Sequence, residues 1–182
     1  MELSPVRSSF GTSVYKTDNG MLIKMKKGTG NVQVNDNGVV VVNGGEKVRI
    51  AGTRGDDKLV VKDAHVSFVS TDSGKDRVLL DNCSYDRYSH FWGTGSRIQT
   101  GPTMFRRGNK GDYADIMIRG DFNGGILAQQ GAGKGYGDDS KAHKDYIRIT
   151  GDNNGHINVD SHDKVKVKGE KGHIFNTTIY YC

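Results

Sequence analysis

The residues with the densest potential chemistry lie between Asn82 and Trp92. This segment holds Cys83, Asp86 and His90, which are the residue types of a nucleophile, an orienting acid and a general base. Catalytic partners, however, usually converge from distant segments, so closeness in sequence is poor evidence for a site. We therefore predict no catalytic residue from this cluster.

The same segment carries a second pattern, an aromatic row. If the chain is extended here, Tyr88, His90 and Trp92 share one face because side chains alternate with a period of two. Such a row can stack on sugar rings, or it can cover an edge of the core. We keep these three as candidate binding residues, with the edge-covering role as the alternative.

Basic side chains form a further row near the C-terminal end of the sequence. Lys164, Lys166 and Lys168 alternate with valines, and Arg148 extends the row if the isoleucines beside it point inward. Stacked strands would merge these side chains into a positive stripe that attracts anionic polymers in a salt-dependent way. The alternative is that the lysines provide solubility and protect strand edges.

The sequence carries no strong motif for a cofactor or a metal. There is no HExxH or CxxC, and the stretch 131–137 departs from a P-loop because Ala128 replaces the first Gly and Gly135 replaces Ser or Thr. We expect no cofactor and no metal ligand, and we interpret residues 124–144 as a Gly-rich loop.

The elements that must position these residues are short β strands. Alternating apolar and polar runs recur from residue 21 to the end, separated by turn sequences such as NDNG, NGGE and GDNNG. No convincing amphipathic helix is present. The predicted strands are 21–25, 31–34, 39–42, 47–50, 58–61, 66–69, 77–80, 88–92, 97–100, 115–118, 146–149, 156–159, 164–167 and 174–181.

An aspartate directly precedes several of these runs. The five are Asp57, Asp76, Asp115, Asp145 and Asp163, at intervals of 19, 39, 30 and 18 residues. Three intervals are near multiples of nineteen, which favours an all-β, single-domain β-solenoid in which the aspartates occupy one corner of stacked coils. A β-sandwich or barrel is the alternative.

Within a solenoid, we expect Asp57, Asp76 and Asp163 at equivalent corners. We also expect Val60, Leu79 and Val167 in the interior. Antiparallel pairing of these strands in two facing sheets would reject the solenoid.

Two segments, GTRGDDKLVV and SGKDRVLLDN, loosely resemble nonapeptides of the RTX β-roll, whose unit is GGxGxD followed by an apolar residue. In that family, glycines and aspartates of successive turns bind calcium. The chain is also similar in broad pattern to parallel β-helix proteins, including secreted adhesins, phage appendages and polysaccharide lyases. No specific family is identified.

Length and charge set the remaining limits. With 182 residues the chain suits one domain, divided into a lead-in segment (1–20) and a β-repeat domain (21–182). No apolar stretch is long enough to span a bilayer, and no secretory signal is apparent. We expect a cytoplasmic protein or one secreted without a cleaved signal. The net charge of +5 weakly favours anionic partners.

We predict a non-enzymatic structural or binding module that presents a rigid β surface to an anionic polysaccharide or a protein, as an effector, adhesin or phage-type appendage would. The alternative is a polysaccharide lyase or glycoside hydrolase, with candidate residues Asp115, Arg119, Asp121 and Lys166. Nucleic acid is a less favoured partner, through the same basic rows.

The RTX resemblance generates a test. Because the full GGxGxD unit does not occur in this sequence, we predict no strong calcium requirement. The melting temperature, followed by circular dichroism, should barely change between excess calcium and chelator. A rise of more than about 10 °C with calcium would contradict this prediction, since it implies several kcal/mol of linked binding.

Overall fold

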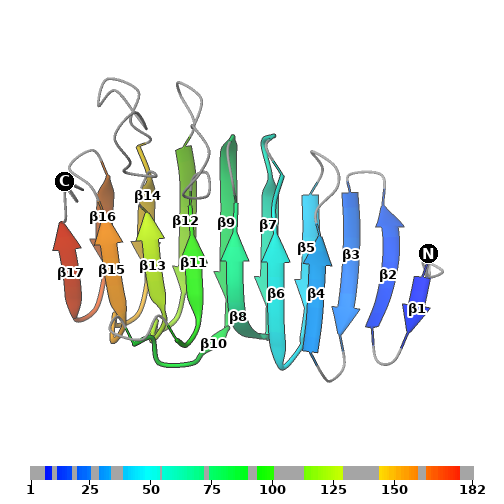
Figure 1. Cartoon of the computed structure of the whole chain (residues 1–182), viewed down its shortest axis with the longest axis horizontal. Helices are drawn as coiled ribbons and strands as arrows, with labels where there is room; N and C mark the ends of the chain where they lie inside the picture. Colours follow the sequence, from blue (N-terminus) through cyan, green and yellow to red (C-terminus); the bar gives the residue numbers. More distant parts are fainter. Residues whose placement is uncertain are drawn as a thin grey trace.

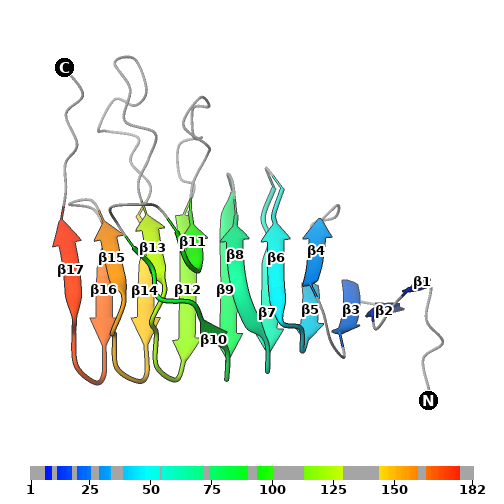
Figure 2. The same cartoon turned by 60° about the horizontal axis from the view of Figure 1, so that its bottom comes forward.

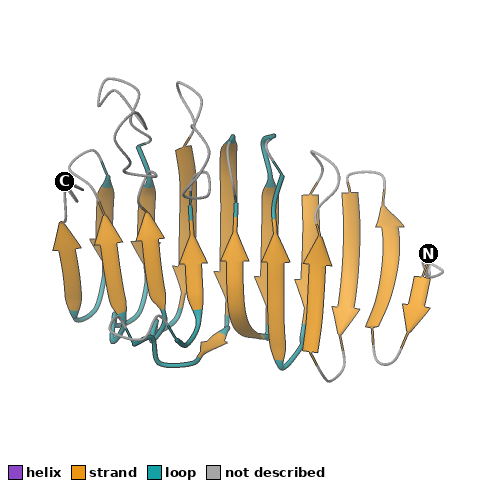
Figure 3. Ribbon diagram, viewed as in Figure 1, coloured by secondary structure: helices purple, strands orange, loops and turns teal. Residues whose placement is uncertain are grey.

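The computed structural model is all-β in the residues that it describes. These are residues 7–9, 12–17, 20–25, 29–33, 39–53, 55–71, 74–89, 94–100, 113–128, 144–159 and 163–176. Figure 3 shows that this part of the chain consists of strands, loops and turns, with no helix. Short alternating runs interrupted by Gly, Asn and Asp favour this outcome.

Nine strands form one sheet, here called sheet A. Its spatial order is β1-β2-β3-β5-β7-β9-β12-β14-β16. The bounds are β1 Arg7–Ser9, β2 Thr12–Thr17, β3 Gly20–Met25, β5 Val39–Asn43, β7 Lys58–Lys62, β9 Lys75–Asp81, β12 Tyr113–Arg119, β14 Tyr146–Ile149 and β16 Lys164–Val167.

The remaining strands form sheet B. Its order is β17-β15-β13-β11-β8-β6-β4, and the short β10 pairs with β8 beside this path. The bounds are β4 Thr29–Gln33, β6 Lys47–Ala51, β8 His65–Ser70, β10 Ser84–Tyr85, β11 Arg97–Gln99, β13 Gly125–Ala128, β15 His156–Val159 and β17 His173–Asn176.

From β3 onward the chain passes between the two sheets, with β10 and β11 falling consecutively in sheet B (Figures 1 and 2). Neighbours within each sheet are parallel, except that β1, β2 and β3 pair antiparallel. Neither sheet closes on itself. The strands named in the solenoid prediction, β7, β9 and β16, all belong to the parallel part of sheet A.

The core lies between the sheets and is built from two inward positions on most strands. In sheet A these are residues such as Leu59 and Val61 on β7, and Ile116 and Ile118 on β12. Because the register is parallel and in step, equivalent apolar side chains stack from strand to strand. Fully burying each of them contributes about 1.5–3 kcal/mol relative to exposure.

Buried aspartates form a column where the chain enters sheet A. Asp57 is 0% exposed, and Asp76 and Asp145 are each 1% exposed. The backbone N–H of Asp57 donates to the Asp76 carboxylate at 3.0 Å, and that of Asp145 donates to Asp163 at 2.9 Å. The predicted equivalence of Asp57, Asp76 and Asp163 is confirmed, since the three lie in one register row across sheet A.

Asp115 is the exception to the repeat. The residue in register with Asp76 is Ala114, whose N–H donates to the Asp145 carboxylate at 2.7 Å. Asp115 therefore points outward, one position beyond the column. The interval of 39 residues between Asp76 and Asp115 corresponds to one step in sheet A, from β9 to β12, rather than to two repeats.

The buried aspartates correct the predicted interior. Since the aspartates themselves point inward, the inward positions are those two and four residues later, such as Leu59 and Val61. Val60 and Leu79 lie on the outer face and are half-buried, so the prediction for these two was wrong by one residue. Val167 does pack against the core, as expected.

At the opposite corner, where the chain leaves sheet A, several turns need a left-handed residue. The positions in step are Gly44 (φ 77°), Asp63 (φ 51°), Asn82 (φ 52°) and Gly120 (φ 107°). Gly, Asn and Asp are the residues that adopt this conformation at low cost. The Asn82 amide also donates to the Asp63 carboxylate at 2.6 Å, which links adjacent turns.

Three parts of the sequence prediction differ from the fold. Strands β1 and β2 lie within the lead-in segment 1–20, where no strand was expected. Residues 125–128 form β13 rather than the start of the Gly-rich loop, and 129–143 lie outside the described residues. Tyr88 lies outside any strand, so the predicted strand 88–92 is wrong at its first residue.

The aspartate column predicts a pH effect on stability. Burial, helped by the neighbouring Asp57 and Asp56 carboxylates, raises the pKa of Asp76 from 3.8 to about 8. Because the folded-state pKa is the higher one, proton binding stabilises the fold at acid pH, and this stabilisation is lost as pH rises from about 4 through 8. Asp76→Asn keeps an acceptor for the Asp57 N–H but cannot ionise.

We therefore expect Asp76→Asn to melt several degrees above wild type at pH 9 and close to it at pH 5. Thermal melts followed by circular dichroism across this range would measure the difference. If the difference in melting temperature between wild type and variant were the same at every pH, ionisation of Asp76 would not destabilise the fold, and the prediction would be wrong.

Candidate binding face

The outer face of sheet A, from β7 to β16, gathers basic side chains from strands far apart in sequence. We call this surface the basic face. The parallel register aligns its outward residues in three rows across the strands. The rows are Lys58–Arg77–Asp115–Tyr146–Lys164, then Val60–Leu79–Met117–Arg148–Lys166, and finally Lys62–Asp81–Arg119, with Lys168 just beyond β16.

Charge on the basic face is strongly unbalanced. The outward positions of these five strands hold eight Lys or Arg and two Asp, so the surface is positive. Both carboxylates already have partners. Asp115 accepts two hydrogen bonds from Arg148, at 2.7 and 3.0 Å, and Asp81 accepts one from Arg119 at 3.4 Å. The lysines and Arg77 thus supply the surplus charge.

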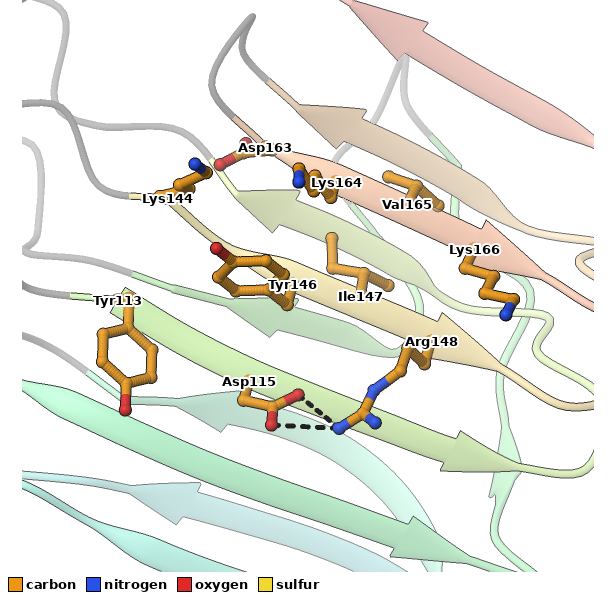
Figure 4. A pocket seen from close by; sticks show the side chains of 10 residues that line it. All are labelled: Tyr113, Asp115, Lys144, Tyr146, Ile147, Arg148, Asp163, Lys164, Val165 and Lys166. Carbon is orange, nitrogen blue, oxygen red and sulfur yellow. Dashed lines mark hydrogen bonds and ion pairs between the residues drawn. The ribbon is translucent and has the colours of Figure 1, made fainter.

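A shallow open groove crosses the C-terminal half of this face (Figure 4). Tyr113 and Tyr146 form part of its wall, and the Lys164 ammonium lies 6.0 Å from the centroid of the Tyr146 ring. Figure 4 shows Arg148 directed toward Asp115, while Lys166 projects from β16 beside it. The groove combines fixed cations with the flat faces of two aromatic rings.

A second open groove lies toward the N-terminal half, between two charged rows. Val60, Leu79 and Met117 form its half-buried apolar line, and they are in register on adjacent strands. Neighbouring strands are about 4.8 Å apart, so this line presents a regular apolar track perpendicular to the strands. A ligand along it would meet charge on both sides.

Four of the predicted binding residues come together on the basic face. Arg148 and Lys166 are direct partners in the pairing of β14 with β16, Lys164 lies two residues earlier, and Lys168 follows the strand. Their role in binding stays a prediction. The other basic residues of this face, such as Lys58 and Arg77, were not among the predicted site residues. Side chains alternate between the two faces of a strand, so the residue after each inward aspartate points outward. Applied to Asp57 and Asp76, this rule would have placed Lys58 and Arg77 on the outer face.

The aromatic row of the sequence prediction has a different outcome. Tyr88 is only 5% exposed, and its ring covers Gly125 on the outside of sheet B. Its neighbour Ser89 pairs with Thr94 in an antiparallel bridge, so the chain turns back here. Tyr88 therefore packs rather than presents a surface. His90 and Trp92 lie outside the described residues.

Cys83 lies in an environment that suppresses its reactivity. The thiol donates to the carbonyl oxygens of Val61 and Asp81, each at 3.5 Å, and burial raises its pKa. A neutral thiol is a poor nucleophile because the thiolate is the reactive form.

The residues proposed for a lyase do not converge. Asp115 bonds to Arg148, whereas Arg119 lies at the far end of the same strand and bonds to Asp81. Asp121 follows β12, and its carboxylate accepts the N–H of Asp152 at 2.8 Å. Lys166 is separated from Asp115 by the intervening β14.

Across the described residues, no group of three His, Cys, Asp or Glu side chains is placed to hold a metal ion. The same residues include no helix long and apolar enough to cross a membrane. Comparison of the chain with models of protein families, with curated proteins and with solved structures found no match.

The contact between Tyr88 and Gly125 gives a prediction. A Cβ added at Gly125 would lie 2.5 Å from Cγ of the Tyr88 ring. Gly125→Ala should therefore destabilise the fold by about 1–3 kcal/mol, the usual range for overpacking. Urea unfolding would measure this change. In a Tyr88→Ala background the same substitution should cost much less, and equal costs in both backgrounds would contradict the contact.

Proposed function

We propose that the two parallel sheets are the two sides of a β-solenoid. Three observations support this architecture: the chain passes repeatedly between the sheets, the pairing from β3 onward is parallel, and inward aspartates recur in one column. Each pair of strands then forms one coil, and the segment from β9 to β12 is one coil enlarged by β10.

We further propose that this protein is a non-enzymatic binding module for an anionic polysaccharide, and that the basic face is its binding surface. The observation that carries the proposal is the unbalanced charge of that face, where both carboxylates are already bonded to arginines. Such a surface concentrates polyanions and loses them as salt rises.

The apolar track favours a sugar polymer over other anionic chains. Val60, Leu79 and Met117 can pack against the C–H faces of sugar rings while Lys58 and Lys62 meet acidic substituents on either side. Tyr113 and Tyr146 continue the apolar contact in the groove of the C-terminal half. A uronate chain combines flat, partly apolar rings with one carboxylate per unit, so it matches both features.

The proposal predicts salt-dependent binding through named lysines. Wild-type protein should bind immobilised polyuronate in low salt and elute as ionic strength increases. Lys164→Gln with Lys166→Gln should weaken binding at least about tenfold at low salt, because each cation near an anionic surface contributes about 1 kcal/mol. Exposed strand positions cost little stability, so the fold should be unchanged.

The matched control is Arg87→Gln with Lys171→Gln, which removes two exposed cations that lie outside the basic face. This control should bind like wild type. An equal loss of affinity in both variants would mean that binding depends only on the net charge of the protein. Equal affinity for single-stranded DNA of matched charge would reject the preference for sugar, and release of unsaturated sugars absorbing in the ultraviolet would identify a lyase instead.

A further inference from the structure

The strands of sheet B share a feature that the basic face does not have. None of them, from β4 to β17, contains an Asp or a Glu. Their outward positions include uncharged residues such as Ser70, Gln99 and Leu127, together with the following cations, histidines and aromatic rings: Lys47, Arg49, His65, Phe68, Arg97, His156, His173 and Phe175. A carboxylate from outside these strands, that of Asp86, lies 3.3 Å from the His65 ring.

Two arginines on this face are held in place by one ring. Arg49, Phe68 and Arg97 are in register on β6, β8 and β11. The Arg49 and Arg97 guanidinium carbons lie 5.2 and 5.1 Å from the centroid of the Phe68 ring. With strands about 4.8 Å apart, the arginines stand roughly 10 Å from each other, one on each side of the ring.

Stacking matters because it orders the guanidinium groups before a ligand arrives. A guanidinium packed on an aromatic ring keeps its N–H fork free for bidentate bonds to a carboxylate. Less side-chain entropy is lost on binding than for a free lysine. Sheet B therefore offers two oriented guanidinium groups that can bind carboxylates, whereas the basic face offers mainly lysine ammonium groups, which act as point charges.

The other end of the same face is aromatic. The rings of His156 and His173 are stacked with centroids 5.2 Å apart, and the Phe175 ring lies nearly parallel to His173 at 6.1 Å. Phe175 is 45% exposed. A sugar ring can contact the exposed part of this aromatic stack while acidic groups further along the same chain reach the two arginines.

Sheets A and B pack against each other through the shared core, so their outer faces point in opposite directions (Figure 2). We propose that the protein is bivalent: the basic face and the outer face of sheet B each bind an anionic polysaccharide, and one molecule thereby bridges two chains. This inference rests on the proposed function of the basic face.

Light scattering tests the bridging. Wild-type protein mixed with long polyuronate at low salt should scatter strongly at an intermediate protein-to-polymer ratio, and scattering should fall again in excess polymer as bridges separate. Arg49→Gln with Arg97→Gln should abolish the maximum while binding to immobilised polyuronate stays within about threefold of wild type. Lys164→Gln with Lys166→Gln should also abolish the maximum.

Two controls sharpen the experiment. Lys171→Gln removes one exposed cation from the turn between β16 and β17, outside the strands of both faces, and should scatter like wild type. Ser70→Asp with Gln99→Glu adds two carboxylates beside the arginines and keeps Arg49, Phe68 and Arg97 themselves. This variant should also abolish the scattering maximum. It therefore tests sheet B independently of whether the arginine variant folds.

The outcomes separate the two proposals. If the folded Arg49 and Arg97 variant, or the Ser70 and Gln99 variant, scattered light as strongly as wild type, the outer face of sheet B would not be a binding surface. Binding by wild-type protein without any scattering maximum would overturn bridging and leave the basic face intact. Absence of binding by wild-type protein would overturn the proposed function itself.

Discussion

The hydrogen bond between a buried aspartate and the backbone N–H of the adjacent strand is the constraint on which sheet A depends. Asp76 accepts from Asp57, Asp145 from Ala114, and Asp163 from Asp145. A slip of one residue would turn every side chain of a strand to the opposite face. It would also leave a carboxylate buried without its donor, which is costly. These bonds therefore fix which side chains face the core and which form the basic face.

The same constraint explains how the molecule combines a narrow core with charged outer faces. From β5 to β16, the strands of sheet A place apolar residues such as Val61 and Leu80 inward beside the aspartates, and most of their outward positions carry polar or charged side chains. Stacking in register then brings the Lys and Arg side chains of different strands onto one surface. Periodicity thus concentrates charge, because a side chain repeated at one position recurs about every 4.8 Å.

The two outer faces carry their positive charge on different kinds of side chain. On sheet A, Asp115 and Asp81 neutralise Arg148 and Arg119, so the lysines and Arg77 supply the excess charge. On sheet B the stacked Arg49 and Arg97 meet no carboxylate from the strands around them. Lysine rows suit salt-sensitive attraction, whereas oriented guanidinium groups suit directional bonds.

The sequence by itself determined the all-β class and nearly all the strands from β3 onward, because alternation and turn residues act locally. The sequence placed Arg148 beside Lys164 and Lys166 only if the strands stack, a condition that the pairing of β14 with β16 meets. It did not determine register across strands. Asp115 seemed equivalent to Asp76, yet Ala114 takes that position, and Val60 lies outside rather than inside. Tyr88 is buried because it packs over Gly125, which is distant in sequence. The Arg49–Phe68–Arg97 stack likewise exists only in the tertiary structure, since it joins three strands from successive passes of the chain.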